Sequence, residues 1–127
     1  MVIILRMFKS ILHSSVIVTS TEKSLVFYHD ILGLPIDSSR PDLGYPGAWL
    51  HVGSQQIHLL EVDNPDPIID RPQHGGRDRH VALETSQLNE LIDILKANDI
   101  YFSLSRSGRS ALFFRDPDGN TIEVIQS

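Results

Sequence analysis

The sequence lacks cysteine altogether, which excludes a disulfide framework, a zinc–thiolate site and catalysis by a thiol. It also lacks a long apolar run. The apolar opening Met1-Val-Ile-Ile-Leu-Arg is too short for a signal peptide or a membrane span. No nucleophile elbow, P-loop or dinucleotide-binding fingerprint is present. The net charge of −5 opposes nucleic acid or an anionic membrane as the main partner. The absence of cysteine fits a reducing compartment, so we expect a cytoplasmic protein.

The chain does contain an internal repeat, and both copies place a metal-ligand residue at the same two points. The first copy opens at His13 and carries His58 near its end. The second copy opens at His80 and carries Glu123 near its end, at almost the same spacing. One His with a second His or a Glu, twice over, is the composition of a divalent metal site.

Each copy predicts a strand, an amphipathic helix and three further strands. The whole chain, 1–127, has the length of a single domain. Within it we expect module one at about 11–62, a linker at 63–79 that is rich in proline and glycine, and module two at 80–126. The predicted fold class is α+β, with two βαβββ modules forming a curved eight-stranded mixed sheet around a metal cavity. The expected strands cover residues 11–18, 34–36, 48–52, 56–62, 80–84, 100–103, 111–115 and 121–125, and the helices end near Leu32 and Asn98.

The alternation of side chains along a strand separates the candidate ligands from the apolar residues beside them. His58 and Glu123 point away from the apolar faces that pack under the helices, and a buried Glu123 would be costly without a cation. A pseudo-two-fold axis between the modules would bring four ligands together. They suit Zn, Ni, Mn, Fe or Co as the divalent ion, and ligand type does not choose among these metals. The predicted metal ligands are His13, His58, His80 and Glu123.

Other residues are candidates for the substrate pocket. Trp49 and His51 share one face of a strand, so both could line the cavity. Arg106 and Arg109 lie in a Ser/Gly loop before the final hairpin, where a mobile lid that binds an anionic substrate could sit. For any single Arg a solvated position is the more common outcome. The further Arg candidates are Arg77, Arg79 and Arg115, and we expect His29 and His74 to be solvated.

Five stretches of the sequence resemble the glyoxalase / bleomycin-resistance / extradiol-dioxygenase group, the vicinal oxygen chelate superfamily. The resemblance spans about residues 11–126, and its most specific features are Phe-Tyr followed by Leu-Gly-Leu, and much later Asp-Pro-Asp-Gly-Asn-Thr-Ile-Glu. It implies paired βαβββ modules around a divalent metal that chelates two substrate oxygens. The matching stretches are Ser24–Leu34, Gly47–Gly53, Gln56–Leu60, Arg79–Leu83 and Phe113–Glu123.

The resemblance also implies roles for the candidate ligands. In glyoxalase I-like members the residue corresponding to Glu123 is the catalytic base, whereas the position of His58 usually carries Glu. In extradiol dioxygenases and fosfomycin-modifying enzymes the metal triad corresponds to His13, His80 and Glu123. Many small members form homodimers in which a module of one chain pairs with a module of the other, and the linker at 63–79 is long enough to permit this.

Three functions follow as hypotheses. The first is a metal-dependent lyase or isomerase acting on a small α-hydroxycarbonyl or related oxygen-chelating substrate, with Glu123 moving the proton. The second is an Fe(II) extradiol-type dioxygenase that uses His13, His80 and Glu123. The third is a drug- or metabolite-binding protein without chemistry, like the bleomycin-resistance members. The convergent ligands oppose the third, and we favour the first over the second. The sequence does not identify the substrate.

Overall fold

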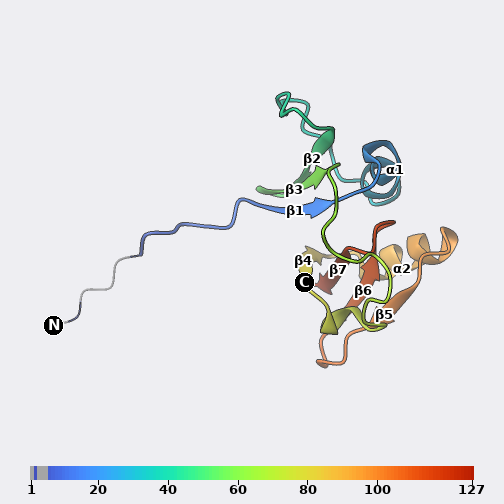
Figure 1. The fold of residues 1–127 in the computed structure, drawn as a ribbon. Coiled ribbons are helices and arrows are strands. Elements are labelled where there is room, and N and C mark those ends of the chain that lie inside the picture. The colour runs from blue at the N-terminus through green and yellow to red at the C-terminus, as the bar shows by residue number, and fades with distance from the viewer. Residues whose placement is uncertain (1, 3–5) are drawn as a thin grey trace.

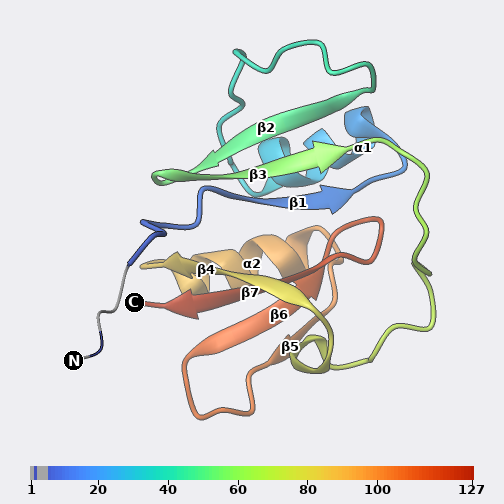
Figure 2. The ribbon, with the colours of Figure 1, turned by 60° about the vertical axis from the view of Figure 1, so that its left-hand side comes forward.

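The computed structural model describes residue 2 and residues 6–127, and it contains two sheets, one from each half of the chain (Figures 1 and 2). In both sheets the first strand pairs in parallel with the last strand of the same half, and the other pairings are antiparallel. The α+β class is confirmed. The strands of the first sheet, in spatial order, are β1 (His13–Ile17), β3 (Gln55–Leu60) and β2 (Gly47–Val52). Those of the second sheet are β4 (His80–Thr85), β7 (Thr121–Gln126), β6 (Ala111–Arg115) and β5 (Phe102–Leu104).

In the part of the chain that the structure describes, two sheets stand in place of the expected single sheet of eight strands. Among the described residues, seven strands make two separate sheets, and the segment expected at 34–36 makes only one bridge, between Ile36 and Leu50. Pro35 in that segment has no N–H to donate to a ladder. β1 and β4 lie side by side and run in opposite directions (Figure 2). Side-chain-lined cavities of about 190 and 700 Å³ lie between them instead of backbone hydrogen bonds.

The two helices lie in the predicted places. The first begins as α1 (Thr21–Leu25), where the Ser20 side chain accepts a hydrogen bond from the Lys23 N–H as an N-cap. It continues as the π-helix η1 (Val26–Ile31), a widening that hydrophobic periodicity does not reveal, and Gly33 ends it at φ +76°. The second helix is α2 (Leu88–Ala97). None of the helices in the described part of the chain has the length and apolar character that a membrane crossing requires.

The turn at 116–120 joins the two halves of the molecule. It closes the predicted hairpin of β6 and β7, with Gly119 at φ +83°. The Tyr28 hydroxyl donates to Asp116 at 2.6 Å, and the Asn120 amide donates to the Ile17 carbonyl at 3.0 Å. Burial raises the pKa of both Tyr28 and Asp116. One cluster of buried apolar side chains also contains residues of both halves, so the relative position of the sheets is fixed by packing and by polar contacts.

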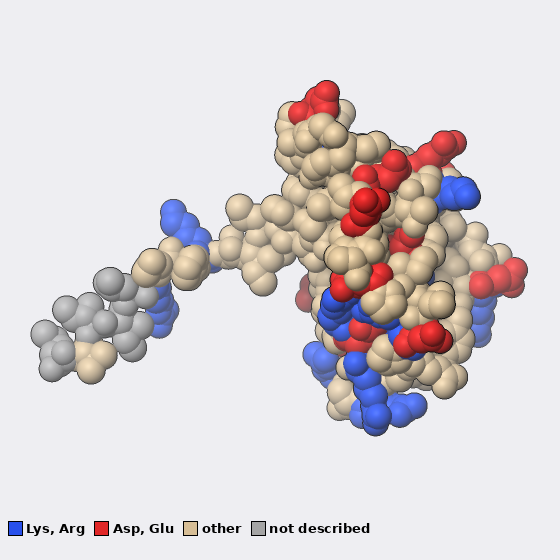
Figure 3. Space-filling model, in the orientation of Figure 1, with Lys and Arg blue, Asp and Glu red and all other residues tan. Residues whose placement is uncertain are grey.

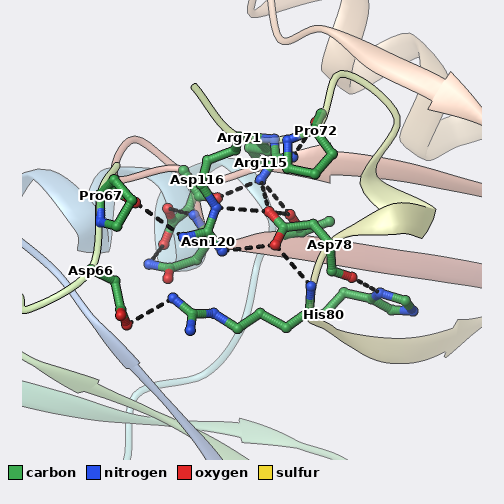
Figure 4. A network of polar contacts seen from close by, with 12 residues as sticks. Asp66, Pro67, Arg71, Pro72, Asp78, His80, Arg115, Asp116 and Asn120 are labelled. Atoms are coloured by element: carbon green, nitrogen blue, oxygen red, sulfur yellow. Dashed lines mark hydrogen bonds and ion pairs between the residues drawn. The ribbon is translucent and has the colours of Figure 1, made fainter. Parts of the chain in front are cut away.

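The linker is held against the second sheet by charged side chains (Figure 4). Asp78 accepts from Arg71 at 2.8 Å and from Arg115 at 2.7 Å. The Arg115 guanidinium also donates to the Thr121 hydroxyl at 2.6 Å. A short 3-10 helix, η2 (Gly75–Arg77), precedes Asp78. The linker therefore leads into β4 at a fixed point, and Arg115 is a structural residue instead of the substrate anchor considered from the sequence.

Candidate metal centre

The first pair of candidate ligands lies on the sheet of the first half. His13 on β1 and His58 on β3 stack with ring centroids 3.9 Å apart, and Trp49 stacks on the other face of His58 at 4.5 Å. The apolar neighbours Ile57 and Leu59 are buried in the core, as strand alternation predicts. His58 therefore occupies the middle of a three-ring stack on the opposite face of its strand.

A chain of hydrogen bonds orients His58. Gln56 donates its amide N–H to Asp37 at 2.8 Å, so its carbonyl oxygen faces His58 Nε2 at 2.7 Å. Because that oxygen can only accept, Nε2 carries the proton and a neutral His58 keeps its lone pair on Nδ1. Burial lowers the pKa of His58, and the nearby His13 and Arg40 lower it further. His58 is thus held neutral, the form in which imidazole binds a metal.

The second pair lies on the sheet of the second half. His80 Nε2 on β4 is 3.2 Å from Glu123 Oε1 on β7. His80 Nδ1 lies 2.8 Å from the Asp78 carbonyl, which can only accept, so Nδ1 carries a proton. Phe113 packs edge-on against the His80 ring at 5.2 Å between centroids. The position of the imidazole is therefore fixed by a backbone carbonyl and an aromatic ring.

The contact between His80 and Glu123 needs a proton or a metal cation between the two facing atoms. Glu123 is only 3% exposed, and a buried carboxylate is costly unless it is paired. With Nδ1 protonated, a neutral His80 would aim the Nε2 lone pair at a carboxylate oxygen, which is repulsive. A proton or a metal cation between the two atoms removes this repulsion. The donor set of one imidazole nitrogen and one carboxylate is also what Zn²⁺ and similar divalent ions bind, so this pair fits a metal.

The four candidate ligands do not meet within one chain. Among the described residues, no group of three or more His, Asp or Glu side chains could share one ion. His13 and His80 each begin a strand, and β1 and β4 run in opposite directions (Figure 2), so the two residues lie at opposite ends of this strand pair. The pseudo-two-fold relation expected from the repeat therefore produces two separate pairs. We call His13 with His58 the first half-site, and His80 with Glu123 the second half-site.

The second half-site opens into a cavity of about 360 Å³. Arg109 donates to Glu123 Oε2 at 3.3 Å from the loop between β5 and β6. Arg106 on the same loop and Arg77 of η2 also line the cavity, which places three predicted Arg candidates together. Lys and Arg side chains gather at the bottom of the view in Figure 3, where the loop between β5 and β6 lies in Figure 1.

His74 is a cavity residue that the sequence reasoning missed. Its Nδ1 is 2.9 Å from the Ser103 hydroxyl and its ring packs edge-on against Phe113, so the expectation of a solvated side chain is wrong. It lies in an irregular segment of the linker, where no periodicity indicates which way a side chain points. A signal was present nonetheless, because Gly75 and Gly76 follow it and allow the backbone to approach Phe113 closely.

The remaining candidates lie in several places. Trp49 stacks on His58 of the first half-site. His51 is exposed on the same strand, with Nδ1 3.4 Å from the Gln56 amide nitrogen. Arg79 pairs with Asp66 at 2.8 Å, away from the cavity. His29 is exposed, as expected, with Nδ1 2.8 Å from the Leu34 carbonyl.

Comparisons with known proteins agree with this architecture. A sequence model of the Glyoxalase/Bleomycin resistance protein/Dioxygenase superfamily matches residues 10–124. Glyoxylase I 4 of Arabidopsis thaliana is 31% identical over 121 residues, which are 91% of this chain and 69% of that protein. A glyoxalase family protein from Bacillus anthracis has a similar structure, with a TM-score of 0.80, 22% identity and coverage of 98% of this chain and 99% of that one. The fosfomycin resistance protein FosX from Listeria monocytogenes has a TM-score of 0.75, with 18% identity and coverage of 94% and 91%. The chain therefore belongs to the Glyoxalase/Bleomycin resistance protein/Dioxygenase superfamily.

Proposed function

We propose that the protein is a divalent-metal-dependent lyase or isomerase acting on a small α-hydroxycarbonyl or related oxygen-chelating substrate. The observation that carries this proposal is the second half-site, where a buried carboxylate and an oriented imidazole face each other at 3.2 Å, a pairing that a metal cation between the two atoms would satisfy. Membership in a superfamily that includes glyoxalases supports a small-molecule reaction. The metal would be held by His80 and Glu123, together with His13 and His58.

A bound divalent ion would polarise two substrate oxygens and acidify the C–H between them. The proton would then move to Glu123, which has two carboxylate oxygens and lies beside the cavity of about 360 Å³. Because Glu123 is buried, water competes little for that proton. His80 would keep its position through the Asp78 carbonyl while the carboxylate changes its protonation state.

We further propose that the complete centre forms between two copies of the chain. Each half-site offers two ligands, and a divalent ion of this kind usually takes four. The halves are too far apart to share an ion within the described residues of one chain. A symmetric dimer would place the first half-site of one copy against the second half-site of the other, twice. The stacked His13 ring is exposed and can rotate to aim a nitrogen at the shared ion, while His58 stays fixed.

A complementation experiment tests the shared centre. One chain carries His13→Ala with His58→Ala, and the other carries His80→Ala with Glu123→Gln. Each alone should bind no Co²⁺ by calorimetry, whereas the two chains refolded together should bind about a quarter of the wild-type amount. That fraction follows because about half of randomly formed dimers are mixed and each mixed dimer holds one intact centre. A mixture without Co²⁺ binding, beside a wild type that binds it, would contradict the shared centre.

A proton-exchange experiment tests the reaction class. Metal-loaded protein in deuterated water should incorporate deuterium at the hydroxyl-bearing carbon of hydroxyacetone, followed by proton NMR. Glu123→Gln should slow this exchange by about a hundredfold or more, because a positioned base contributes roughly that factor. Glu84→Gln removes an exposed carboxylate from the neighbouring strand and should leave the rate unchanged. Equal exchange in both variants would exclude Glu123 as the base.

The structure also gives a reason to test oxygenase chemistry. Gln56 and Trp49 fix the His58 ring, so an ion that lies out of reach of its Nδ1 would be bound by His13, His80 and Glu123, a two-His, one-carboxylate set of the kind that Fe²⁺ oxygenases use. Oxygen uptake by anaerobically Fe²⁺-loaded protein, without exchange of the hydroxyacetone proton, would favour this second function. Binding of hydroxyacetone without either reaction would favour a binding protein.

A further inference from the structure

Arg109 and the proposed metal would compete for the same carboxylate. The Arg109 side chain is 57% exposed, and its guanidinium reaches Glu123 Oε2 at 3.3 Å from a loop with Gly108 at φ +85°. The Glu123 side chain is only 4% exposed, and among the described residues its carboxylate contacts the His80 imidazole and the Arg109 guanidinium. A divalent ion bound to Glu123 would supply the positive charge that Arg109 supplies in the structure. The guanidinium could then leave without exposing an uncompensated buried charge.

The surroundings decide where the released guanidinium would act. Arg77, Arg106 and Arg109 line the same cavity, and Glu123 is the carboxylate among its lining residues. Among the described residues, Arg77 and Arg106 form no ion pair. The Ser105 and Ser107 hydroxyls of the loop bond to each other at 2.7 Å, which leaves one of the two O–H groups free to donate to a ligand. Such a group of guanidinium and hydroxyl donors suits a carboxylate, sulfate or phosphate group. This concentration of positive charge is notable in a chain with a net charge of −5.

We propose that Arg109 exchanges partners, from Glu123 to an anionic group of the substrate, when the metal binds. The inference rests on the proposed metal centre and adds the substrate class, a small molecule that carries a carboxylate, sulfate or phosphate group beside its chelating oxygens. Arg77 and Arg106 form the permanent part of the anion subsite, and Arg109 completes it. Metal and anion therefore bind cooperatively, and by linkage each raises the affinity of the other by the same factor.

Calorimetry with Co²⁺ and with sulfate as the anion probe tests the exchange. Arg109→Gln removes the competitor of the metal and should tighten Co²⁺ binding about fivefold, since the pair it breaks is half exposed. Arg106→Gln is the matched control, because it removes the same charge from the same loop without a contact to Glu123. It should change Co²⁺ affinity less than about twofold and should weaken sulfate binding.

The sulfate titrations isolate the cooperative part. In the wild type, saturating Co²⁺ should tighten sulfate binding about fivefold more than it does in Arg109→Gln, because the charge of the ion acts in both proteins but only the wild type gains a guanidinium. Equal or weaker Co²⁺ affinity in Arg109→Gln, or equal tightening of sulfate binding in the two proteins, would overturn the exchange while leaving the metal centre intact. Failure of the wild type itself to bind Co²⁺ would refute both the centre and the exchange.

Discussion

Replacing His80 by alanine is expected to abolish tight divalent metal binding. His80 is the only imidazole beside the buried carboxylate of Glu123 that points a ring nitrogen at it among the described residues, at 3.2 Å. Loss of residues that merely orient a ligand costs about 10- to 100-fold in metal affinity, so loss of the ligand should cost more than about 100-fold. The measurement is metal content by elemental analysis of untagged protein, with Co²⁺ titration by calorimetry.

His29→Ala is the matched control for this prediction. It also removes an imidazole, but from an exposed position on η1, and should leave the metal stoichiometry unchanged. Unaltered metal content in His80→Ala would refute the centre. Thermal unfolding of both variants checks that the fold survives, which is expected because the His80 side chain is 28% exposed and packs mainly against Phe113.

Replacing Asp78 by alanine is expected to reduce the free energy of unfolding by about 3 kcal/mol, because removal of one partner leaves the other charges of a buried pair uncompensated. The Asp78 carboxylate binds both Arg71 and Arg115 (Figure 4). The Asp78 side chain is 9% exposed, and those of Arg71 and Arg115 are 17% and 25% exposed. Denaturant unfolding monitored by circular dichroism measures the loss. The change should appear in the midpoint of the transition.

Asp66→Ala provides the comparison, since it breaks the exposed pair of Arg79 and Asp66, whose side chains are 65% and 43% exposed. That loss should be below about 1 kcal/mol. Equal effects of the two substitutions would show that the network around Asp78 does not hold the linker.

The contribution of Asp78 also has a defined pH dependence. Hydrogen bonds from the Arg71 and Arg115 side chains hold the pKa of this carboxyl well below its usual range. A depressed carboxyl pKa stabilises the folded state at every pH above the unfolded value of about 3.9, and the stabilisation is lost as the pH falls through the folded value. Because the unfolded carboxyl titrates at about 3.9, the difference in unfolding free energy between the wild type and Asp78→Ala should be constant from about pH 5 to 8. The difference should narrow below about pH 4.

Local patterns predicted much of the fold. Strand alternation correctly placed Ile57, Leu59, Ile122 and Val124 in the core, because the side chains of a strand point to opposite faces whatever the surrounding fold. The hairpin of β6 and β7 followed from its turn residues, since Gly119 has the positive φ that such a turn needs. The prediction of a strand at 34–36 was wrong, because a strand needs backbone N–H donors for its ladder and Pro35 has no N–H.

The sequence by itself determined the chemistry that each half could offer. His13, His58, His80 and Glu123 were identifiable because their residue types and their spacing in the repeat are local properties of the chain. Their division into two half-sites was decided by the tertiary structure, because it depends on the opposite directions of β1 and β4 and on the turn at 116–120 that fixes the two sheets. The contact of Arg109 with Glu123 and the entry of His74 into the cavity were also decided there, because loops without periodicity are positioned by what they pack against.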